Sequence, residues 1–291
     1  MTRARATLTG FAAILLWSLL ALLTVGSAPV PPFLLNVLSF GIGGGIGLAW
    51  VAARPGFGVL RGVPVAAYAL GTAGLFGYHA LYFTAFRLAA PAGAEAATGL
   101  IAYLWPLFIV LFSGLLPGER LRPQHIAGAA LALAGAALIV LRGGAAIGGG
   151  AAPALALALL CALTWAAYSV ASRRFATVPT AAVAVCCLAT AALSLPVHLA
   201  FETTAWPAGA SGWLAVAVLG AGPVGAAFYA WDVGMKRGDI QLLGVASYAA
   251  PLLSTLALVA AGIAAPTPII ALAALFITGG AVLAARAGRA G

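Results

Sequence analysis

The segment YHALYFTAFRLAAP, residues 78–91, places a histidine among aromatic side chains in an otherwise apolar stretch. Tyr78, Tyr82 and Phe86 follow one another at helical spacing, which predicts an aromatic stripe on one face of a helix. His79 begins the neighbouring stripe. Ring faces bind planar apolar ligands, and a few phenol or imidazole groups fix their orientation by hydrogen bonds. The alternative interpretation is an aromatic packing face that contains one hydrogen-bonded histidine.

The composition of the chain decides which solvent surrounds this segment. Of its 291 residues, 64% are hydrophobic and 7% are charged, whereas soluble domains carry about 25% charged residues. Many apolar runs approach the roughly 20 residues that a helix needs to cross a bilayer. We therefore predict an all-α integral membrane protein. An ionisable side chain is costly inside a bilayer and usually faces the bundle interior or water, which favours a place for His79 along a pathway.

Loop and charge signals divide the chain into ten predicted membrane-spanning helices. Twelve of the 14 basic residues lie in one set of loops and termini, and only Arg87 and Arg142 lie in the opposite set. The positive-inside rule therefore places both termini in the cytoplasm. The basic N-terminal segment is expected to lead into the first span and not into a cleaved signal peptide. The expected spans are residues 8–25, 33–52, 64–86, 92–115, 124–141, 152–171, 180–200, 212–234, 239–262 and 268–285.

The two halves of the chain carry an internal repeat. A shift of 145 residues brings the YLWP motif at 103–106 onto the YAAP motif at 248–251. With a slightly different offset, Trp17 meets Trp165. Because each half holds five spans, the second half starts on the opposite side of the membrane, and such inverted repeats are typical of secondary transporters with a site at the repeat interface. The predicted organisation is a five-helix repeat at 1–141, a glycine-rich linker at 142–151 and a second five-helix repeat at 152–291.

Aromatic residues in the middle of spans are the main candidates for a binding site. Trp17 and Trp165 occupy matching positions in the two halves, away from the membrane surfaces where tryptophan belts lie. We predict that they face a central cavity together with the aromatic segment around His79. Asn36 is a further polar candidate, although a hydrogen bond between helices explains it equally well. The predicted substrate-binding residues are Trp17, Tyr78, His79, Tyr82, Trp165, Tyr168, Tyr103, Tyr248 and Asn36.

Charged residues and prolines near the span ends are candidates for gating or coupling. Arg87 and Glu95 flank a short outer loop and are spaced for an ion pair. This pair is either an extracellular latch or a solvated pair that contributes little to stability. Asp232 precedes Lys236 by four residues, which favours an ion pair at the cytoplasmic edge over a charge that engages the substrate or a proton. Two prolines in matching positions of spans four and nine are expected to kink their helices. Each kink serves either as a hinge or binding feature, or only to shape the packing of the bundle. The possible gate or coupling residues are Arg87, Glu95, Asp232, Pro106 and Pro251.

Four stretches of the chain are specific enough to suggest a family. They are MTRARATLTGFAAILLWS (1–18), YLWPLFIVLF (103–112), TWAAYSVASRRFA (164–176) and AFYAWDVGMKRGDIQLLGVASYAAPLLS (227–254). They resemble the EamA-type branch of the drug/metabolite transporter superfamily, over essentially the whole chain. The resemblance implies ten helices in two inverted halves, and export of aromatic and other neutral amino acids across the bacterial inner membrane.

Two positions depart from the pattern of that family. The chain has Asp232 where the family has an asparagine after an alanine–tryptophan pair. It has His79 where the family has an acidic residue after the tyrosine of span three. A shared role in proton coupling is therefore not carried over to either position.

The sequence carries no sign of enzymatic chemistry. It has no P-loop, its three histidines are remote from one another, and no paired carboxylates have supporting context. We predict a transporter without cofactor or metal, driven by a gradient of substrate or ion. Its expected partners are a small amino acid and the lipid bilayer, and nucleic acid is excluded because the basic residues follow membrane topology. The three cysteines lie inside predicted spans and are expected to be small buried side chains.

Two alternatives to amino acid export stay open. The first keeps the fold and exports other metabolites or cationic drugs, although Glu95 and Asp232 are the only acids that lie beyond the first residue of a predicted span. The second is a membrane-embedded enzyme or sensor, which would need a catalytic cluster or an appended soluble domain. The sequence does not decide between proton-coupled and facilitated transport. It also leaves the oligomeric state open, with a monomer compatible with every feature above.

Overall fold

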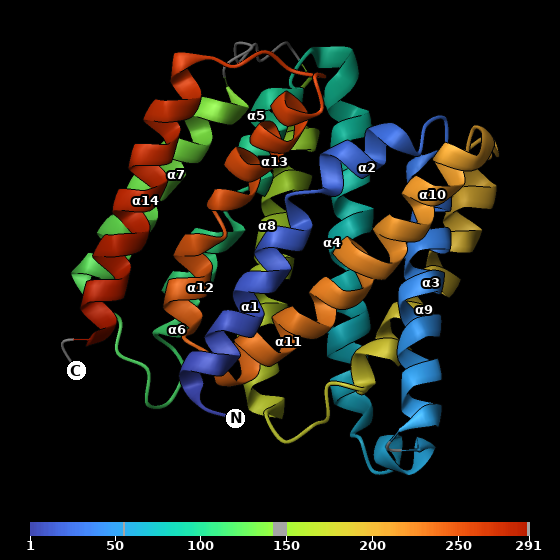
Figure 1. Ribbon diagram of the computed structural model, residues 1–291, viewed down its shortest axis with the longest axis horizontal. Coiled ribbons are helices and arrows are strands. Elements are labelled where there is room, and N and C mark those ends of the chain that lie inside the picture. Colours follow the sequence, from blue (N-terminus) through green and yellow to red (C-terminus); the bar gives the residue numbers. More distant parts are fainter. Residues whose placement is uncertain (55, 142–149, 290–291) are drawn as a thin grey trace.

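The computed structural model describes residues 1–54, 56–141 and 150–289, and every regular element within them is a helix (Figure 1). This confirms the predicted all-α class for the described part of the chain. Most of the predicted linker 142–151 lies outside the described residues. The helices of the first half are α1 (Arg3–Trp17), α2 (Leu20–Gly26), α3 (Pro32–Ala53), α4 (Val65–Ala89), α5 (Glu95–Ala102), α6 (Trp105–Ser113) and α7 (Pro123–Val140). Those of the second half are α8 (Ala152–Ala171), α9 (Ala182–Phe201), α10 (Gly209–Leu219), α11 (Ala227–Arg237), α12 (Ile240–Ala246), α13 (Ala249–Ala260) and α14 (Pro268–Arg289).

Nine helical segments within the described residues are long and apolar enough to cross a membrane. Helix α4 is not one of them, since its glycine, tyrosine and histidine residues lower its hydropathy. Its 25 residues nevertheless extend about 37 Å at about 1.5 Å per residue, more than the roughly 30 Å hydrocarbon core of a bilayer. The nine segments are Arg3–Gly26, Pro32–Ala53, Glu95–Ser113, Pro123–Val140, Ala152–Phe175, Ala182–Phe201, Gly209–Arg237, Ile240–Ala260 and Pro268–Ala287.

Both proline motifs of the repeat coincide with breaks between helices. Pro106 lies in the first turn of α6, where its missing amide costs no intrahelical hydrogen bond. Pro251 likewise lies in the first turn of α13. The hydroxyl of Tyr248 accepts a hydrogen bond of 3.1 Å from the amide of Leu107. This bond joins the two breaks, and it satisfies one of the amides that the start of α6 leaves without an intrahelical partner.

Glycines allow the closest contacts between helices. Gly43 of α3 faces Gly225 in the π-helical turn η4 (Gly220–Ala226), and a Cβ atom on Gly43 would lie 2.9 Å from the Cα of Gly225. Gly128 of α7 faces Gly280 of α14, and a Cβ atom on Gly128 would lie 2.6 Å from the carbonyl oxygen of Gly280. Lipid supplies little hydrophobic force between helices, so small residues stabilise the bundle by letting backbones approach.

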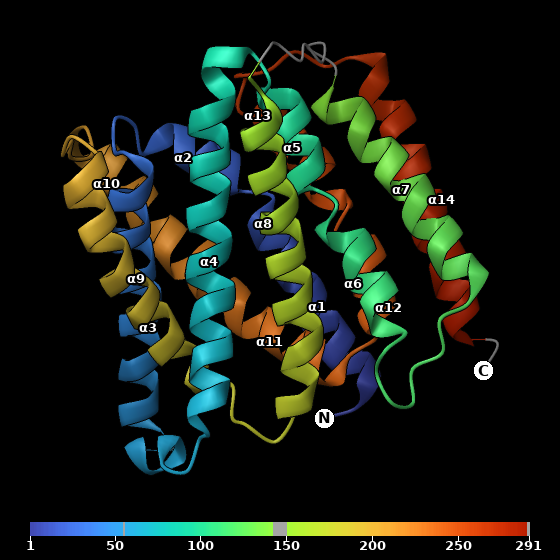
Figure 2. The same ribbon diagram turned by 180° about the vertical axis from the view of Figure 1, so that it is seen from behind.

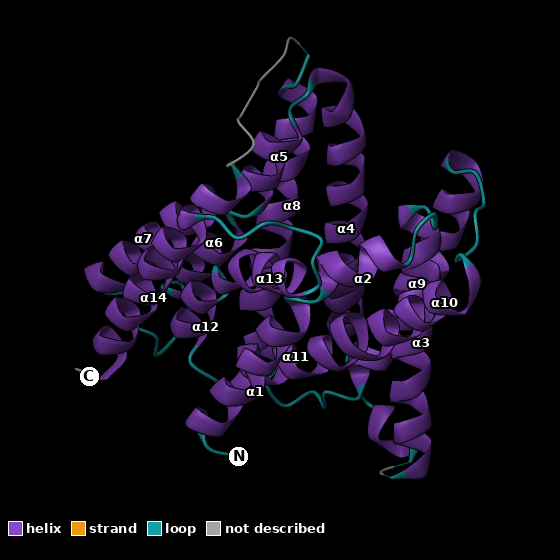
Figure 3. Ribbon diagram, turned by 45° about the horizontal axis from the view of Figure 1, so that its top comes forward, coloured by secondary structure: helices purple, strands orange, loops and turns teal. Residues whose placement is uncertain are grey.

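The helices of the two halves alternate in the bundle. The most extensively packed pairs are α1 with α11, α3 with α9, α4 with α8 and α7 with α14, and each pair joins the first half to the second. Figure 2 shows α4 beside α8, and Figure 3 shows α7 and α14 on one side of the molecule and α3, α9 and α10 on the other. The start of α1 and the end of α14 lie at the same end of the bundle, at the bottom of Figure 1. Any site at the centre is therefore built from both halves.

Candidate functional site

A cluster of aromatic rings lies at the centre of the bundle, around Trp17 at the end of α1. The indole of Trp17 donates a hydrogen bond of 3.1 Å to a backbone carbonyl in η4, which fixes its orientation. Ring separations of 4.5 to 7 Å are favourable when the rings are tilted or edge-to-face. The ring centroids nearest to that of Trp17 are those of Trp231 at 5.0 Å, Trp165 at 5.8 Å, Phe228 at 5.9 Å and Trp105 at 6.3 Å.

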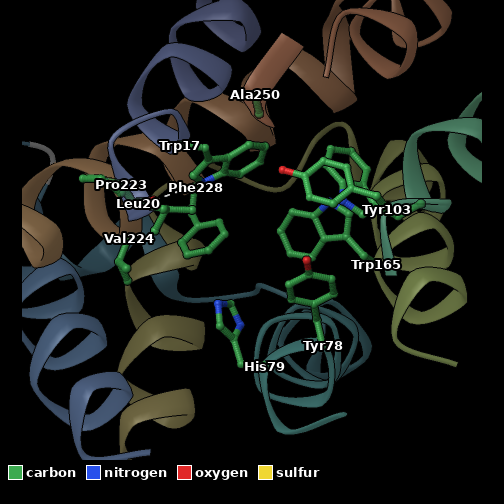
Figure 4. A pocket seen from close by; sticks show the side chains of 11 residues that line it. Trp17, Leu20, Tyr78, His79, Tyr103, Trp165, Pro223, Val224, Phe228 and Ala250 are labelled. Atoms are coloured by element: carbon green, nitrogen blue, oxygen red, sulfur yellow. Dashed lines mark hydrogen bonds between the residues drawn. The ribbon is translucent and has the colours of Figure 1, made fainter. Parts of the chain in front are cut away.

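A cavity of about 90 Å³ lies beside this cluster (Figure 4). Rings form most of its wall, and the polar atoms of Tyr78, His79 and Tyr103 are directed toward the space between them. An apolar cavity of about 150 Å³ admits benzene. The present space is therefore too small for an aromatic side chain and must widen to bind one. The lining residues are Trp17, Leu20, Tyr78, His79, Tyr103, Trp105, Trp165, Pro223, Val224, Phe228 and Ala250.

His79 is held in one orientation in this wall. Its Nδ1 atom lies 2.7 Å from the carbonyl oxygen of Leu75, one helical turn earlier on α4. Because a carbonyl only accepts hydrogen bonds, Nδ1 carries the proton, and Nε2 of the neutral ring is an acceptor. The rings of Phe40 and Tyr78 pack edge-to-face with the imidazole at centroid distances of 5.0 and 5.2 Å. His79 thus offers the cavity one hydrogen-bond acceptor in a fixed direction.

Two more predicted tyrosines lie near the cavity without lining it. Tyr82 packs between Tyr78 and Phe86, with centroid distances of 6.0 and 4.6 Å, so the predicted aromatic stripe is present on α4. Tyr168 packs on Trp165 at 5.3 Å. It also lines a second cavity of about 30 Å³, which lies toward the end of the bundle that holds the termini and is called the inner cavity below.

The remaining predicted binding residues are buried in helix packing. Tyr248 is fully buried and bonds the start of α6, and Asn36 is 4% exposed with no described partner for its Nδ2 atom. The wall residues that sequence analysis did not select are Leu20, Trp105, Pro223, Val224, Phe228 and Ala250. A signal existed for two of them, since the repeat aligns Phe228 with Phe83 and the YLWP motif contains Trp105.

Asp232 and Lys236 form the ion pair that their spacing favours. The carboxylate and the ammonium lie 2.8 Å apart, and the two residues are only 4% and 8% exposed. Thr180 donates a hydrogen bond of 2.7 Å to the same carboxylate, and the ammonium donates one of 3.1 Å to the carbonyl of Val178. The pair lines the inner cavity and lies outside the central one.

The expected pair between Arg87 and Glu95 is absent from the described part of the chain. Arg87 instead donates a hydrogen bond of 3.0 Å to the carbonyl oxygen of Phe201. Both charged residues are exposed, where an ion pair contributes little to stability. Arg87 therefore connects α4 to α9, and Glu95 at the start of α5 takes no part in that contact.

Ion pairs close the end of the bundle that holds the termini. The guanidinium of Arg173, after α8, lies 2.8 Å from the carboxylate of Glu119 and donates to two backbone carbonyls at the end of α11, at 3.0 and 2.6 Å. Arg3 bridges the carboxylates of Glu119 and Asp239 at 3.3 and 3.5 Å. This network joins both halves of the chain at that end. We call it the inner ion network.

An all-helical membrane protein with a central aromatic cavity between two halves has the construction of a small-molecule transporter. The chain belongs to the EamA-like transporter family, whose model matches residues 4–141 and 152–286.

Similar proteins extend over the whole chain. The aromatic amino acid exporter YddG of Ancylobacter novellus is 58% identical over 289 residues, which cover 98% of this chain and 98% of that protein. The aromatic amino acid exporter YddG of Escherichia coli is 28% identical and covers 100% of both chains. A crystal structure of a protein 55% identical to this one matches with a TM-score of 0.92, over 99% of this chain and 100% of the other.

Proposed function

We propose that this protein is a secondary transporter that exports aromatic and other neutral amino acids from the bacterial cytoplasm by alternating access. The observation that carries the proposal is the central cavity between the two halves, whose wall consists mainly of aromatic rings with a few polar atoms. Such a wall suits a planar apolar side chain on a polar backbone. The 58% identity to a protein named aromatic amino acid exporter supports the same class of substrate.

The proposed topology has ten spans in two inverted five-helix repeats, 1–141 and 152–291, with the linker 142–151 between them. Helix α4 supplies the tenth span, since it is long enough and packs on α8 and α9. The helix pairs support the inversion: α1 packs on α11 and α4 on α8, and a two-fold relation between the halves exchanges these two pairs. The basic loops at the end that holds the termini support a cytoplasmic location for both, in the inner membrane.

In this proposal the substrate ring lies among Trp17, Trp165 and Phe228, and the Nε2 atom of His79 accepts a hydrogen bond from the substrate ammonium. The cavity of about 90 Å³ widens as the halves move apart. The inner ion network closes the cytoplasmic end in the conformation described here. Loading from the cytoplasm requires that network to open.

Flux through the purified protein tests this function. Proteoliposomes are loaded with labelled phenylalanine, and efflux is compared with that from protein-free liposomes. Unlabelled tryptophan, leucine, a nucleoside and a cationic drug then compete for the same flux. We expect protein-dependent efflux that tryptophan competes with most strongly. If no amino acid moves in a protein-dependent manner, the proposal is wrong, and competition only by the drug or the nucleoside would assign another cargo.

The substitution His79→Ala is expected to raise the KM for phenylalanine at least roughly tenfold, because a hydrogen bond to a charged group contributes about 1.5 to 3 kcal/mol. His79→Gln keeps an acceptor and is expected to recover part of the affinity. Both variants are measured with and without a pH gradient. The pH dependence is expected to stay unchanged, because a charged imidazolium is costly inside the membrane and no carboxylate is among the residues that line the cavity. A pH dependence that disappears in His79→Ala would contradict this and assign the imidazole a coupling proton.

The substitution Glu119→Gln is expected to open the cytoplasmic end more often, because it removes the carboxylate that Arg3 and Arg173 share. Cys186 lines the inner cavity and is 5% exposed, so it reports this opening. The rate of its reaction with a maleimide is measured after the other two cysteines are replaced by alanine, and we expect it to rise several-fold. Glu95→Gln removes an exposed charge elsewhere and is the control. Equal labelling rates in both variants would rule out this closing role.

A further inference from the structure

A third cavity of about 640 Å³ lies at the end of the bundle opposite the termini, between α3, α4 and α9. It is larger than the central cavity and falls within the 300 to 1,000 Å³ typical of ligand sites. We call it the outer cavity. Phenylalanine rings from all three helices line it, together with one cation and one carboxylate. These residues are Phe33, Phe83, Phe86, Phe201, Arg87 and Glu202.

One face of α4 connects the outer cavity with the central one. His79, Phe83 and Arg87 follow at intervals of four residues and therefore lie along the same side of the helix. His79 lines the central cavity, Arg87 lines the outer one, and Phe83 lies between them. The ring centroid of Phe83 lies 6.1 Å from that of His79 and 5.6 Å from that of Phe33. Along α4, the ring of Phe83 therefore lies between the two spaces.

The carboxylate in the outer cavity is already satisfied. Glu202 accepts hydrogen bonds of 2.9 and 3.2 Å from the amides of Phe33 and Leu34 at the start of α3. It also lies 2.8 Å from Nδ1 of His198. Its side chain is 9% exposed. Glu202 therefore stabilises the start of α3 against α9 and has little capacity left to bind a ligand ammonium.

The cation in the outer cavity is available for a ligand. Arg87 makes one hydrogen bond, to the Phe201 carbonyl, and no ion pair among the described residues. A guanidinium carries five N–H donors in a planar fork that fits a carboxylate with two parallel hydrogen bonds. The outer cavity therefore combines aromatic walls with a binding group for an anion. An amino acid with an aromatic side chain offers the matching ring and carboxylate.

We infer that the outer cavity is a second binding site for the exported aromatic amino acid, occupied after the substrate passes Phe83 and before release. Arg87 binds the substrate carboxylate, and the rings of Phe33 and Phe201 hold the side chain. This inference rests on the proposed export of aromatic amino acids and adds a step to it. The ammonium of the substrate points to water at this site, because Glu202 is occupied by α3.

Equilibrium binding in lipid-free detergent tests the second site. Labelled phenylalanine is titrated onto the wild-type protein, onto Arg87→Gln and onto Arg87→Lys. Glutamine retains a donor for the Phe201 carbonyl, so the contact between α4 and α9 is kept. We expect two molecules to bind per wild-type chain. Arg87→Gln is expected to weaken one of the two affinities at least roughly tenfold, through the loss of a charge-assisted bond, and to leave the other unchanged. The weaker of the two affinities in Arg87→Lys is expected to lie between the values for the wild type and for Arg87→Gln.

Phenethylamine has the ring and the ammonium but no carboxylate. It therefore distinguishes loss of carboxylate binding by Arg87 from a general structural effect of the substitution. It is expected to compete equally in the wild type and in Arg87→Gln. A second variant, Phe201→Ala, truncates a ring that is 64% exposed and leaves its carbonyl in place. Phe201→Ala is expected to weaken phenylalanine binding at the outer cavity and to leave alanine binding at that cavity unchanged.

Three results would overturn the inference. The first is a wild-type chain that binds one phenylalanine only. The second is an Arg87→Gln variant in which both affinities are unchanged. The third is an effect of Arg87→Gln that appears only in bilayers with anionic lipid, which would assign the outer cavity to a lipid headgroup. Wild-type efflux from proteoliposomes is measured in parallel. Efflux together with any of these results removes the second site and leaves the proposed function intact, whereas absent efflux removes the function itself.

Discussion

Replacement of Trp17 by alanine is expected to reduce phenylalanine export severely. Trp17 is the ring at the centre of the aromatic cluster, and it lines the cavity in which the substrate is proposed to bind. Its removal takes away a wall and the hydrogen bond to η4 that holds α1 against the second half. Because η4 is the irregular part of the span that runs into α11, we expect the neighbouring rings to shift as well. Efflux from proteoliposomes is expected to fall at least tenfold.

The same substitution is expected to destabilise the protein. Truncation of a buried tryptophan costs about 3 to 5 kcal/mol in soluble cores. We expect the lower part of that range, because the side chain of a membrane protein is not returned to water when helices separate. The measurement is the midpoint of unfolding in a denaturing detergent, followed by circular dichroism.

Two further variants keep this prediction specific. Trp17→Phe retains a ring but loses the hydrogen bond to η4, and it is expected to keep part of the efflux. Trp213→Ala removes a tryptophan that is 47% exposed and stacks on Trp206 at the bundle surface, and it is expected to transport normally. Wild-type efflux by Trp17→Ala, in a preparation of normal purity and amount, would show that the central cavity is not the transport site.

The class of the fold and the meeting of distant aromatic residues could be predicted from the sequence. Hydropathy marks the apolar helices, because it follows from the energy of placing polar groups in lipid. The repeat then brought Trp17 and Trp165 together as candidates, and their rings lie 5.8 Å apart in the structure. The repeated motifs YLWP and YAAP marked prolines that now lie at helix breaks. Local chemistry was sufficient for these predictions.

The side of each helix that faces the cavity could not be predicted. Almost every face of these helices is apolar, so a tyrosine on the cavity wall and one in helix packing have similar sequence surroundings. Tyr103 lines the cavity, whereas Tyr248, its partner in the repeat, bonds the amide of Leu107. Pro223 and Val224 line the cavity from the π-helical turn η4. No periodic pattern in the sequence marks such a turn.

The ion networks at the two ends were also out of reach of sequence reasoning. Glu119 and Arg173 are 54 residues apart, and Glu202 caps a helix that starts 170 residues before it. Only the packing of α3 on α9 and the approach of α8 to the loop before α7 bring these groups together. Arg87 was expected to bind the nearest acid in the sequence, and the tertiary structure placed a carbonyl of α9 closer. Charges in short loops therefore predict their ion-pair partners poorly, because distant segments of the chain supply the contacts.

The substitution Asp232→Asn is expected to be the most destabilising change of a charged residue. It leaves the ammonium of Lys236 buried with backbone carbonyl and amide partners only, at 8% exposure. Loss of one partner of a buried ion pair costs about 3 to 5 kcal/mol, because the remaining charge is uncompensated. The inner cavity of about 30 Å³ beside the pair has room for one or two water molecules, so we expect a value near the lower limit. The unfolding midpoint in denaturing detergent measures it.

The double variant Asp232→Asn with Lys236→Met distinguishes a structural role of the ion pair from a role in transport. If the pair is structural, as its absence from the wall of the central cavity indicates, removal of both charges is expected to recover most of the lost stability and nearly normal efflux. Thr180 can then still donate to the amide oxygen that replaces the carboxylate. A double variant that regains stability but exports no phenylalanine would contradict the structural role. It would place these charges on the path by which the substrate enters from the cytoplasm, where the inner cavity lies between them and Tyr168.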